Sequence, residues 1–383
     1  MHVAPSNQDE NAAGVLRAAK EGAAGGGRRP LQDFTNNSLA GDLNRLNVKQ
    51  PGQKVPAHQY ATRHRTSMLR ESARPEKPSS QMSWSGMQEH IAEQASVRRP
   101  ARAEPQLPDI DSVDRNNPLA AVEYVSEIYR YFKRTEAKYM VDHNYMRQQV
   151  DINEKMRAIL VDWLIEVHLK FKLVPETLYL AVNLIDRFLA HKQVTRKNLQ
   201  LVGVTAMLIA SKYEEIWAPE VRDFVYISDK AYTRDQILQM EKVMLNALKF
   251  HLTVPTALCF LTRYLKAAGT TDKQATHLAH YMTELALPDC SMLQFPGSLI
   301  SACAVYASRV ALGAAEPWPA ALAAHSGHSP RNDDFDLCTK CLAKLMQKAP
   351  TGSLIAVYKK YSSPKFMEVA KLPYPQSILA GLE

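Results

Sequence analysis

Cysteine is scarce in this sequence, and none occurs before Cys259. The chain has five cysteines among 383 residues, an odd number, and all of them lie in its C-terminal third. A disulfide framework needs paired cysteines, so this distribution argues against one. Free thiols of this kind are typical of proteins in a reducing compartment.

A leader and a membrane-spanning run are also missing. The N-terminal stretch MHVAPSNQDENAAGV has no apolar core, so no secretory signal is expected. The most apolar stretch, inside residues 199–215, is shorter than the roughly 18–20 apolar residues that span a bilayer. We therefore expect no membrane partner.

Signatures of catalysis are absent as well. The sequence has no glycine-rich phosphate loop, no nucleophile elbow and no pair of carboxylates at catalytic spacing, so neither an enzyme nor a bound cofactor is predicted. One spacing resembles a metal site, because Cys338 and Cys341 form a CxxC and His325 and His328 precede it. Leucines flank these cysteines at helical spacing, so we favour a buried thiol pair and predict no metal.

Negative charge is under-represented in residues 1–108. This segment holds 15 Lys and Arg against 10 Asp and Glu and contributes most of the net charge of +8. The cations are spread out, which favours a solvated tail over contact with nucleic acid. The segment also lacks a sustained hydrophobic period, which predicts a disordered regulatory tail.

Residues 199–215, LQLVGVTAMLIASKYEE, form the centre of the predicted fold. Their apolar residues leave no polar face over three turns, which predicts a helix buried on every side. Gly203, Ala206 and Ala210 make one flank thin enough for neighbouring helices to approach closely. The run ends in SKYEE, so the buried helix should surface in a charged tip.

Helical spacing and capping signals extend on both sides of this stretch. Helices are predicted over residues 119–132, 153–171, 178–189, 199–215, a short segment after Pro219, 235–248, 257–268, 273–287, 296–312, 336–347 and 351–361. The predicted N-caps are Asn117, Asn153, Thr195 and Thr233. Residues 313–334 are predicted to be a polar, proline-rich mobile loop.

The pattern has no strand signal and divides into two consecutive blocks of about five helices, which predicts an all-α fold. The expected divisions are a tail at 1–108, an N-terminal helix and linker at 109–152, a first block at 153–252, a second at 253–372 and a final tail at 373–383. The lone helix before residue 153 would pack either on its own domain or on a partner, and both interpretations stay open.

Several sequence blocks in this order resemble the cyclin family. The matching blocks are MRAILVDWL at 156–164, ETLYL at 176–180, LIDRFL at 184–189 and ASKYEE at 210–215. The likeness is close over residues 118–250 and looser over 255–375, and HLKF at 168–171 is similar to the plant and green-algal B-type variant. The resemblance implies two cyclin-box domains and a B-type mitotic cyclin.

A cyclin carries no catalytic residues and acts on a kinase. The resemblance therefore implies a heterodimer with a mitotic cyclin-dependent Ser/Thr kinase, which the cyclin box activates by packing on the kinase's helix C. Arg157 and Asp186 would form an ion pair between the first two helices of the box. The implied kinase contacts lie at the ends of two helices: Ile209, Lys212, Tyr213, Glu241, Leu245, Phe250 and Leu252.

The resemblance also implies a surface that docks Arg-x-Leu peptides of substrates or inhibitors. Its members would be Met156, Ile159, Leu160, Trp163, Glu166, Arg196, Gln200 and Asp229. Glu166 and Asp229 would attract the basic residue of the peptide. By helical spacing alone, Ile159 and Leu160 fit a core position equally well.

One island stands out in the N-terminal tail. Arg28, Leu31 and Asn36 place a cation, an aliphatic side chain and an amide at i, i+3 and i+8, a spacing that suits an extended peptide in a groove. It resembles the destruction box of mitotic cyclins. The resemblance implies recognition by ubiquitin ligase machinery and degradation by ubiquitin-dependent proteolysis.

The alternative on a similar scaffold is a nucleic-acid-binding adaptor like transcription factor IIB. That function would favour an N-terminal zinc ribbon and a clustered basic face, whereas residues 1–108 contain no cysteine and their cations are diffuse. The cyclin interpretation, with control of the G2/M transition, is favoured. The family and weak basic clusters such as Arg98-Arg99 lead us to expect the nucleus and the cytoplasm.

Overall fold

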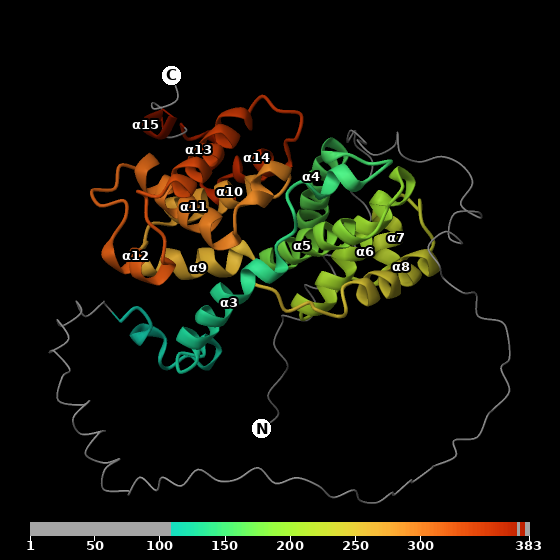
Figure 1. The fold of residues 1–383 in the computed structure, drawn as a ribbon, viewed down its shortest axis with the longest axis horizontal. Coiled ribbons are helices and arrows are strands. Elements are labelled where there is room, and N and C mark those ends of the chain that lie inside the picture. Colours follow the sequence, from blue (N-terminus) through green and yellow to red (C-terminus); the bar gives the residue numbers. More distant parts are fainter. Residues whose placement is uncertain (1–108, 374–375, 380–383) are drawn as a thin grey trace, which may run out of the picture. The chain divides into compact units, whose positions relative to one another are not determined.

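The structure is a computed structural model that describes residues 109–373 and 376–379. The predicted disordered tail at 1–108, with its destruction box, lies outside these residues. Within them the regular elements are α-helices and short 3₁₀-helices, with no strand, as predicted (Figure 1). None of the described helices is both long enough and apolar enough to cross a membrane.

The N-terminal helix starts later than its apolar stripe suggested. Asn117 does act as an N-cap, because its Oδ1 accepts a hydrogen bond from Leu119 N, but the element it opens is the 3₁₀-helix η4, Pro118–Ala120. Ala121 then adopts a left-handed φ of 46°, which ends that turn. The α-helix itself, α3, covers Val125–Tyr139.

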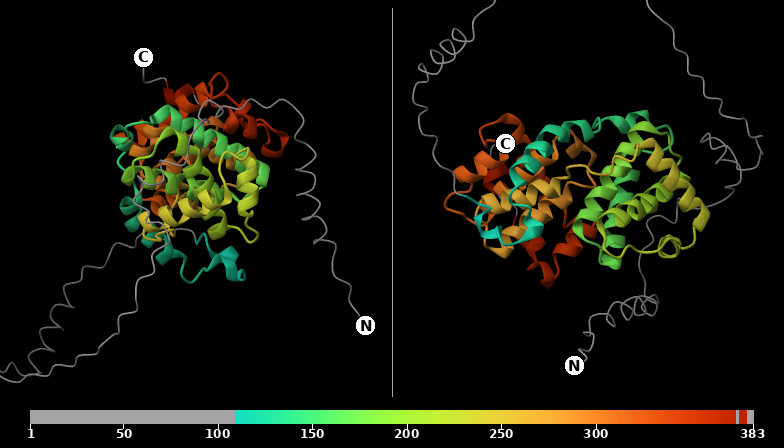
Figure 2. Two further views of the ribbon diagram at one scale, coloured as in Figure 1. Left: turned by 90° about the vertical axis from the view of Figure 1, so that its right-hand side faces the viewer. Right: turned by 90° about the horizontal axis from the view of Figure 1, so that it is seen from below.

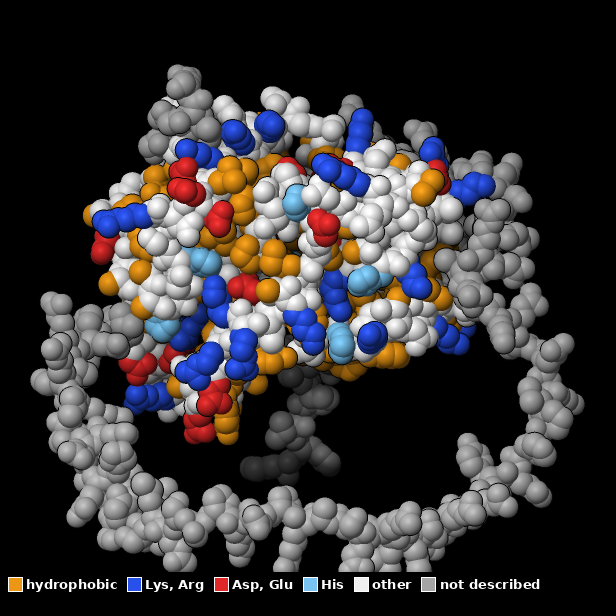
Figure 3. Space-filling model, viewed as in Figure 1, with side chains coloured by type: hydrophobic (Ala, Val, Ile, Leu, Met, Phe, Trp, Pro, Cys, Tyr) orange, Lys and Arg blue, Asp and Glu red, His pale blue; other side chains and the backbone are white. Residues whose placement is uncertain are grey.

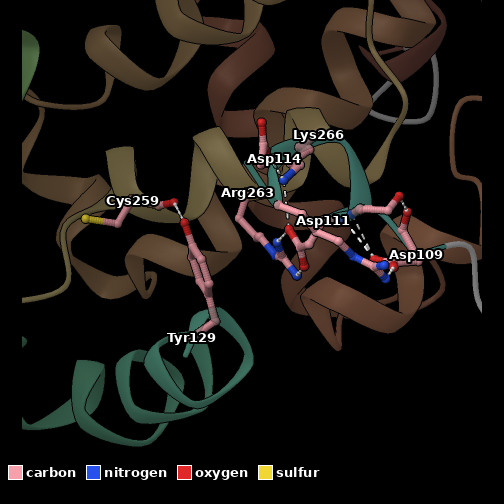
Figure 4. A network of polar contacts seen from close by, with 9 residues as sticks. Asp109, Asp111, Asp114, Tyr129, Cys259, Arg263 and Lys266 are labelled. Carbon is pink, nitrogen blue, oxygen red and sulfur yellow. Dashed lines mark hydrogen bonds and ion pairs between the residues drawn. The ribbon is translucent and has the colours of Figure 1, made fainter. Parts of the chain in front are cut away.

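The segment before α3 is anchored to the second helical block by charge (Figure 4). Asp111 Oδ2 accepts from Arg263 Nη2 at 2.8 Å and its Oδ1 accepts from Lys266 Nζ at 2.7 Å, while Tyr129 donates to the carbonyl of Cys259. The hydrogen bond from Arg263 lowers the pKa of Asp111 to about 2. Part of α3 therefore packs on its own chain.

The first block contains the five predicted helices. They are α4 (Glu154–Phe171), α5 (Pro175–His191), α6 (Arg196–Glu214), α7 (Val221–Ile227) and α8 (Arg234–Ala247). Asn153 caps α4 and Thr233 forms a capping box with Gln236, as predicted. Thr195 makes no side-chain cap; Asp151 Oδ2 accepts from Arg196 N instead.

Helix α6 is the buried centre of this block, as its sequence predicts. Residues 199–211 are all buried, and α6 packs against α4, α5 and α8. Gly203 provides the close approach: a Cβ placed there would lie 2.6 Å from Leu160 Cδ1 on α4. A side chain at this position would therefore overpack the contact between α4 and α6.

The second block has one helix more than predicted. Its helices are α9 (Ala257–Ala267), α10 (Lys273–Leu285), α11 (Gly297–Ala311), α12 (Ala320–Ser326), α13 (Asp333–Lys348) and α14 (Ala356–Tyr361). The prediction of a loop throughout 313–334 was wrong, because α12 buries Ala321 and Leu322 and packs on α9. The prediction for 351–361 was too long, since α14 begins at Ala356. The described fold also contains short elements outside these helices: η3 (Ser112–Asp114), η5 (Tyr145–Gln148), η6 (Cys290–Gln294), η7 (Pro364–Phe366), η8 (Val369–Lys371) and α15 (Gln376–Leu379).

Figure 2 shows the two blocks as two groups of helices, with α3 running beside both. On the second block, Glu136 of α3 accepts hydrogen bonds from the backbone N and Oγ of Ser298, at the start of α11. On the first, the Arg187 guanidinium lies over the Tyr139 ring at 5.2 Å. Helix α3 therefore contacts both blocks.

A buried ion pair joins the two blocks directly. Arg157 Nε and Nη2 donate to the two carboxylate oxygens of Asp186 at 2.6 and 2.7 Å, and Arg157 Nη1 donates to the carbonyls of Leu287 and Pro288 at 2.9 and 3.0 Å. Tyr145 donates to Asp186 at 2.8 Å. Both charged groups are buried, so each depends on these partners.

A second contact crosses the same boundary. Asp162 of α4 accepts a hydrogen bond from Ala356 N at 2.9 Å, so a side chain of the first block caps α14 of the second. Burial raises the pKa of Asp162 to about 6. A groove of about 370 Å³ lies beside this contact, between α4 and the α13–α14 region.

We predict that Asp186→Asn lowers the free energy of unfolding by about 3–5 kcal/mol, because it leaves the Arg157 charge buried without a counter-ion. Urea denaturation would measure the loss. The control is Asp336→Asn, which breaks the pair of an exposed Asp336 with a partly exposed Lys340 and should cost about 1 kcal/mol or less. Equal losses in the two variants would contradict the assigned importance of the buried pair.

Candidate functional site

The ends of α6 and α8 form one exposed surface on the first block. Lys212 Nζ donates to Glu241 Oε1 at 2.7 Å, and this pair joins the last turn of α6 to α8. Tyr213 is exposed, and its hydroxyl is hydrogen-bonded to the Thr253 hydroxyl. Together with the partly exposed Leu245 and Leu252 and the exposed Phe250, these side chains are called the α6–α8 surface.

The turn after α8 holds Phe250 in an outward position. Lys249 and Phe250 both have a left-handed φ, 52° and 57°, a conformation that costs non-glycine residues about 1 kcal/mol or more each. Phe250 N donates to the Leu245 carbonyl at 3.0 Å and Lys249 N to that of Asn246, which stabilises the turn. Phe250 is 63% exposed.

One predicted member of this surface is in the core instead. Ile209 is 2% exposed, because α6 is enclosed by its neighbours until residue 211. It cannot contact a partner in this conformation. Its role is to support the helix end that carries Lys212 and Tyr213.

Two exposed apolar residues next to this surface were not predicted. Ile216 and Trp217 come after Glu215, the C-cap of α6, and are 89% and 90% exposed. Glu215 fixes the start of their loop, because its Oε1 accepts from Val174 N and from Thr177 Oγ1 at the N-terminus of α5. The sequence signal that could have predicted their exposure is an apolar pair in the short loop between the charged end of α6 and Pro219.

The second candidate surface follows the outer face of α4. Ile159 and Trp163 are partly exposed and Glu166 is exposed, so these three are available for docking. Met156 and Gln200, which the resemblance also implied for docking, are buried. The α4 surface, made of Ile159, Trp163 and Glu166, therefore contains fewer residues than the resemblance implied.

The resemblance to the cyclin family placed Leu160 on that surface, but this residue is in the core. It is fully buried and faces Gly203 across the contact between α4 and α6. Helical spacing allowed either a core or a surface position for Leu160, and the core position is the correct one. Because Ile159 is one residue earlier on the same helix, it points to a more exposed side.

The charged members of the predicted docking set differ in their surroundings. Arg196 is exposed, and its Nε donates to Asp151 Oδ1 at 2.8 Å, so it carries an internal counter-ion. Asp229 is exposed and has a left-handed φ of 56°. Tyr232 donates to the carbonyl of Lys197, which brings the loop after Asp229 to the start of α6.

The CxxC of α13 contains one buried and one partly exposed thiol. Cys338 is buried, whereas Cys341 is not, so the predicted buried pair of these two residues was wrong. The thiol that faces Cys338 is Cys303 of α11, whose hydrogen bond together with burial raises the pKa of Cys338. Within residues 109–373 and 376–379, no group of three or more His, Cys, Asp or Glu is arranged to hold a metal.

Comparison with protein families identifies both blocks. Residues 127–253 match "Cyclin, N-terminal domain" and residues 255–375 match "Cyclin, C-terminal domain". Among solved structures, a viral cyclin from herpesvirus saimiri is similar, with a TM-score of 0.53 and 22% identity over 60% of this chain and 99% of that one. The likeness in structure supports the fold alone.

Named relatives are similar over about 70% of the chain. "Cyclin-B2-1" of Arabidopsis thaliana is 48% identical over 285 residues, which are 74% of this chain and 64% of that protein. "G2/mitotic-specific cyclin-2" of Medicago sativa is 48% identical over 263 residues, which are 69% of this chain and 79% of that relative. The chain thus spans just under two thirds of the length of the former and more than two thirds of the latter.

Proposed function

The chain belongs to the cyclin family, within its B-type or G2/mitotic branch, and we propose that it is the regulatory subunit of a mitotic cyclin-dependent Ser/Thr kinase. In this role it supplies no catalytic group, and phosphate transfer takes place on the kinase. A kinase needs its strand lysine and its helix-C glutamate to be brought together. The cyclin would favour that arrangement by binding the active conformation of the kinase more tightly than the inactive one.

The observation that carries this proposal is the α6–α8 surface. It combines a charged pair, Lys212 and Glu241, with the exposed aromatic side chains of Tyr213 and Phe250. An apolar centre with a few fixed polar anchors is typical of tight protein interfaces. Because the pair and the turn at Phe250 are already ordered, little conformational entropy would be lost on binding.

We predict that the double variant Lys212→Ala/Glu241→Ala weakens kinase binding by at least about 2 kcal/mol, roughly thirtyfold in Kd. Removing both charges together avoids leaving one of them unpaired. The measurement adds the full chain to a monomeric mitotic cyclin-dependent kinase and follows both affinity and phosphate transfer.

The matched control is Asp336→Ala/Lys340→Ala, which removes an ion pair of 2.8 Å from α13 in the second block. It should leave binding and activation unchanged, and circular dichroism should show equal helicity in all three proteins. If a well-folded wild-type chain fails to activate the kinase, the proposed function is wrong.

We further propose that the α4 surface docks Arg-x-Leu motifs of substrates or inhibitors. Trp163 and Ile159 offer a partly exposed apolar area, and Glu166 places a negative charge on the same exposed face of α4. An aliphatic side chain and an adjacent cation match that combination. Leu160 lies beneath this surface in the core.

For this surface we predict that Trp163→Ala raises the KM of a substrate with an Arg-x-Leu motif about tenfold, while kcat is retained. The same substrate with Ala-x-Ala in place of the motif is the control, and its KM should not respond to Trp163→Ala. A rise of the same size for both substrates would place the defect in kinase activation and not in docking.

Degradation is proposed to depend on Arg28, Leu31 and Asn36, through ubiquitin ligase machinery. These residues lie outside the described part of the chain, so the proposal rests on their spacing. We also propose that the protein occurs in the nucleus and the cytoplasm.

A fluorescent fusion in dividing cells would test both proposals. Arg28→Ala/Leu31→Ala should lengthen the lifetime of the protein in mitosis several-fold, whereas the control Arg98→Ala/Arg99→Ala should not, and kinase binding should be equal in both. An unchanged lifetime would refute the assignment of the destruction box. Exclusion of the fusion from the nucleus throughout the cycle would refute the proposed location.

A further inference from the structure

A positively charged pocket lies between the end of α3 and the end of α8, outside both surfaces described above. It has a volume of about 430 Å³. Among the described residues, its cationic and titratable lining includes Lys138, Arg187, His191, Lys249 and His251, and Asp142 is the one acid. Figure 3 shows Lys, Arg and His side chains gathered on this face, between α3 and α8. We call this hollow the α3–α8 pocket.

Arg187 is the buried charge of the pocket. Only 8% of it is exposed. Its Nη1 donates to the carbonyl of His251 at 2.9 Å and to Asn183 Oδ1 at 3.3 Å, and its guanidinium stacks over Tyr139. Among the described residues no carboxylate lies within ion-pairing distance of Arg187, and its Nε and Nη2 have no acceptor.

Arg187 differs in this respect from every other buried lysine or arginine in the described part of the chain. Arg157 is paired with Asp186, Arg263 with Asp111, and Lys360 with Glu284. A buried charge is costly unless it is paired, and burial lowers the pKa of Arg187. Because Arg187 is the one described buried cation without a counter-ion, we expect an anion from another molecule to supply it.

The free groups of the pocket match one kind of anion best. Nε and Nη2 lie along one edge of a guanidinium, and that edge binds a carboxylate or a phosphoryl group through two parallel hydrogen bonds. A single carboxylate would satisfy Arg187 alone. The exposed Lys138 and Lys249 add two further cations, which suits a phosphoryl group with three acceptor oxygens and a charge of about −1.5 to −2.

We propose that the α3–α8 pocket binds a phosphorylated side chain of a peptide segment, with Arg187 holding the phosphoryl group and Lys138 and Lys249 flanking it. The left-handed backbone at Lys249 fixes that residue beside the pocket. Phe250, the next residue, belongs to the α6–α8 surface. A phosphopeptide bound here would therefore lie next to the surface proposed for the kinase without sharing its side chains.

The test uses the full chain without any kinase, so its result does not depend on the proposed function. Acetyl-Ala-phosphoserine-Ala-amide is titrated into the protein at low ionic strength by isothermal calorimetry, beside the same peptide with Ser or with Glu in place of phosphoserine. We expect saturable 1:1 binding of the phosphopeptide and at least tenfold weaker binding of the other two. Absence of binding, or equal binding of the Glu peptide, would overturn the proposal.

Variants then locate the site. Lys138→Gln and Lys249→Gln should each raise the Kd about two- to fivefold, the effect of removing one exposed ion pair. The matched control is Lys242→Gln, an exposed lysine of α8 that does not line the pocket and should leave the Kd unchanged. If Lys242→Gln weakens binding as much as the pocket variants, the peptide responds only to net charge and the proposal fails.

Arg187→Gln should raise the Kd roughly tenfold or more, because hydrogen bonds from a charged group are lost. Arg187 also contacts the His251 carbonyl, so circular dichroism and thermal unfolding must show that this variant is folded. If Arg187→Gln is not folded, the Lys138→Gln and Lys249→Gln variants decide whether the pocket binds the phosphopeptide, because both lysines are exposed. A folded Arg187→Gln protein with unchanged affinity would remove Arg187 from the site.

Discussion

The two cyclin boxes depend on each other through the buried charge of Arg157. Its guanidinium uses one edge for Asp186 in its own box and Nη1 for two backbone carbonyls, Leu287 and Pro288, in the other. A desolvated charge is tolerated only when its donors find acceptors. Helices α4 and α5 and the loop after α10 must therefore be in place together, which sets their register.

The buried central helix determines where function can be located. Helix α6 is enclosed along residues 199–211, so in the C-terminal half of this helix a partner can reach only the last turn. Lys212 and Tyr213 lie at that end, and Glu241 of α8 fixes the lysine there. The following loop is held by Glu215 at the start of α5. The packing that buries α6 thus orders the candidate interface before any partner arrives, which reduces the entropy lost on association.

Buried charges in this fold serve two different purposes. Where a cation has an internal counter-ion, as Arg157, Arg263 and Lys360 have, the pair connects two elements of the chain. Among the residues that the structure describes, Arg187 has only neutral acceptors and an aromatic ring around it. The three paired cations connect elements of the fold. Arg187 lines an open pocket, where a bound anion could serve as its counter-ion.

Much of this protein was determined by its sequence alone. Helix periods, N-caps such as Asn153 and Thr233, the buried run at 199–211 and the partnership of Arg157 and Asp186 were all predicted, because they depend on local spacing or on strong family likeness. Tertiary structure alone decided that Leu160 and Ile209 are core, that a helix forms within 313–334, and that no described acidic residue pairs with Arg187. Burial and charge pairing depend on which distant segments cover a side chain, and spacing along one helix carries no information about them.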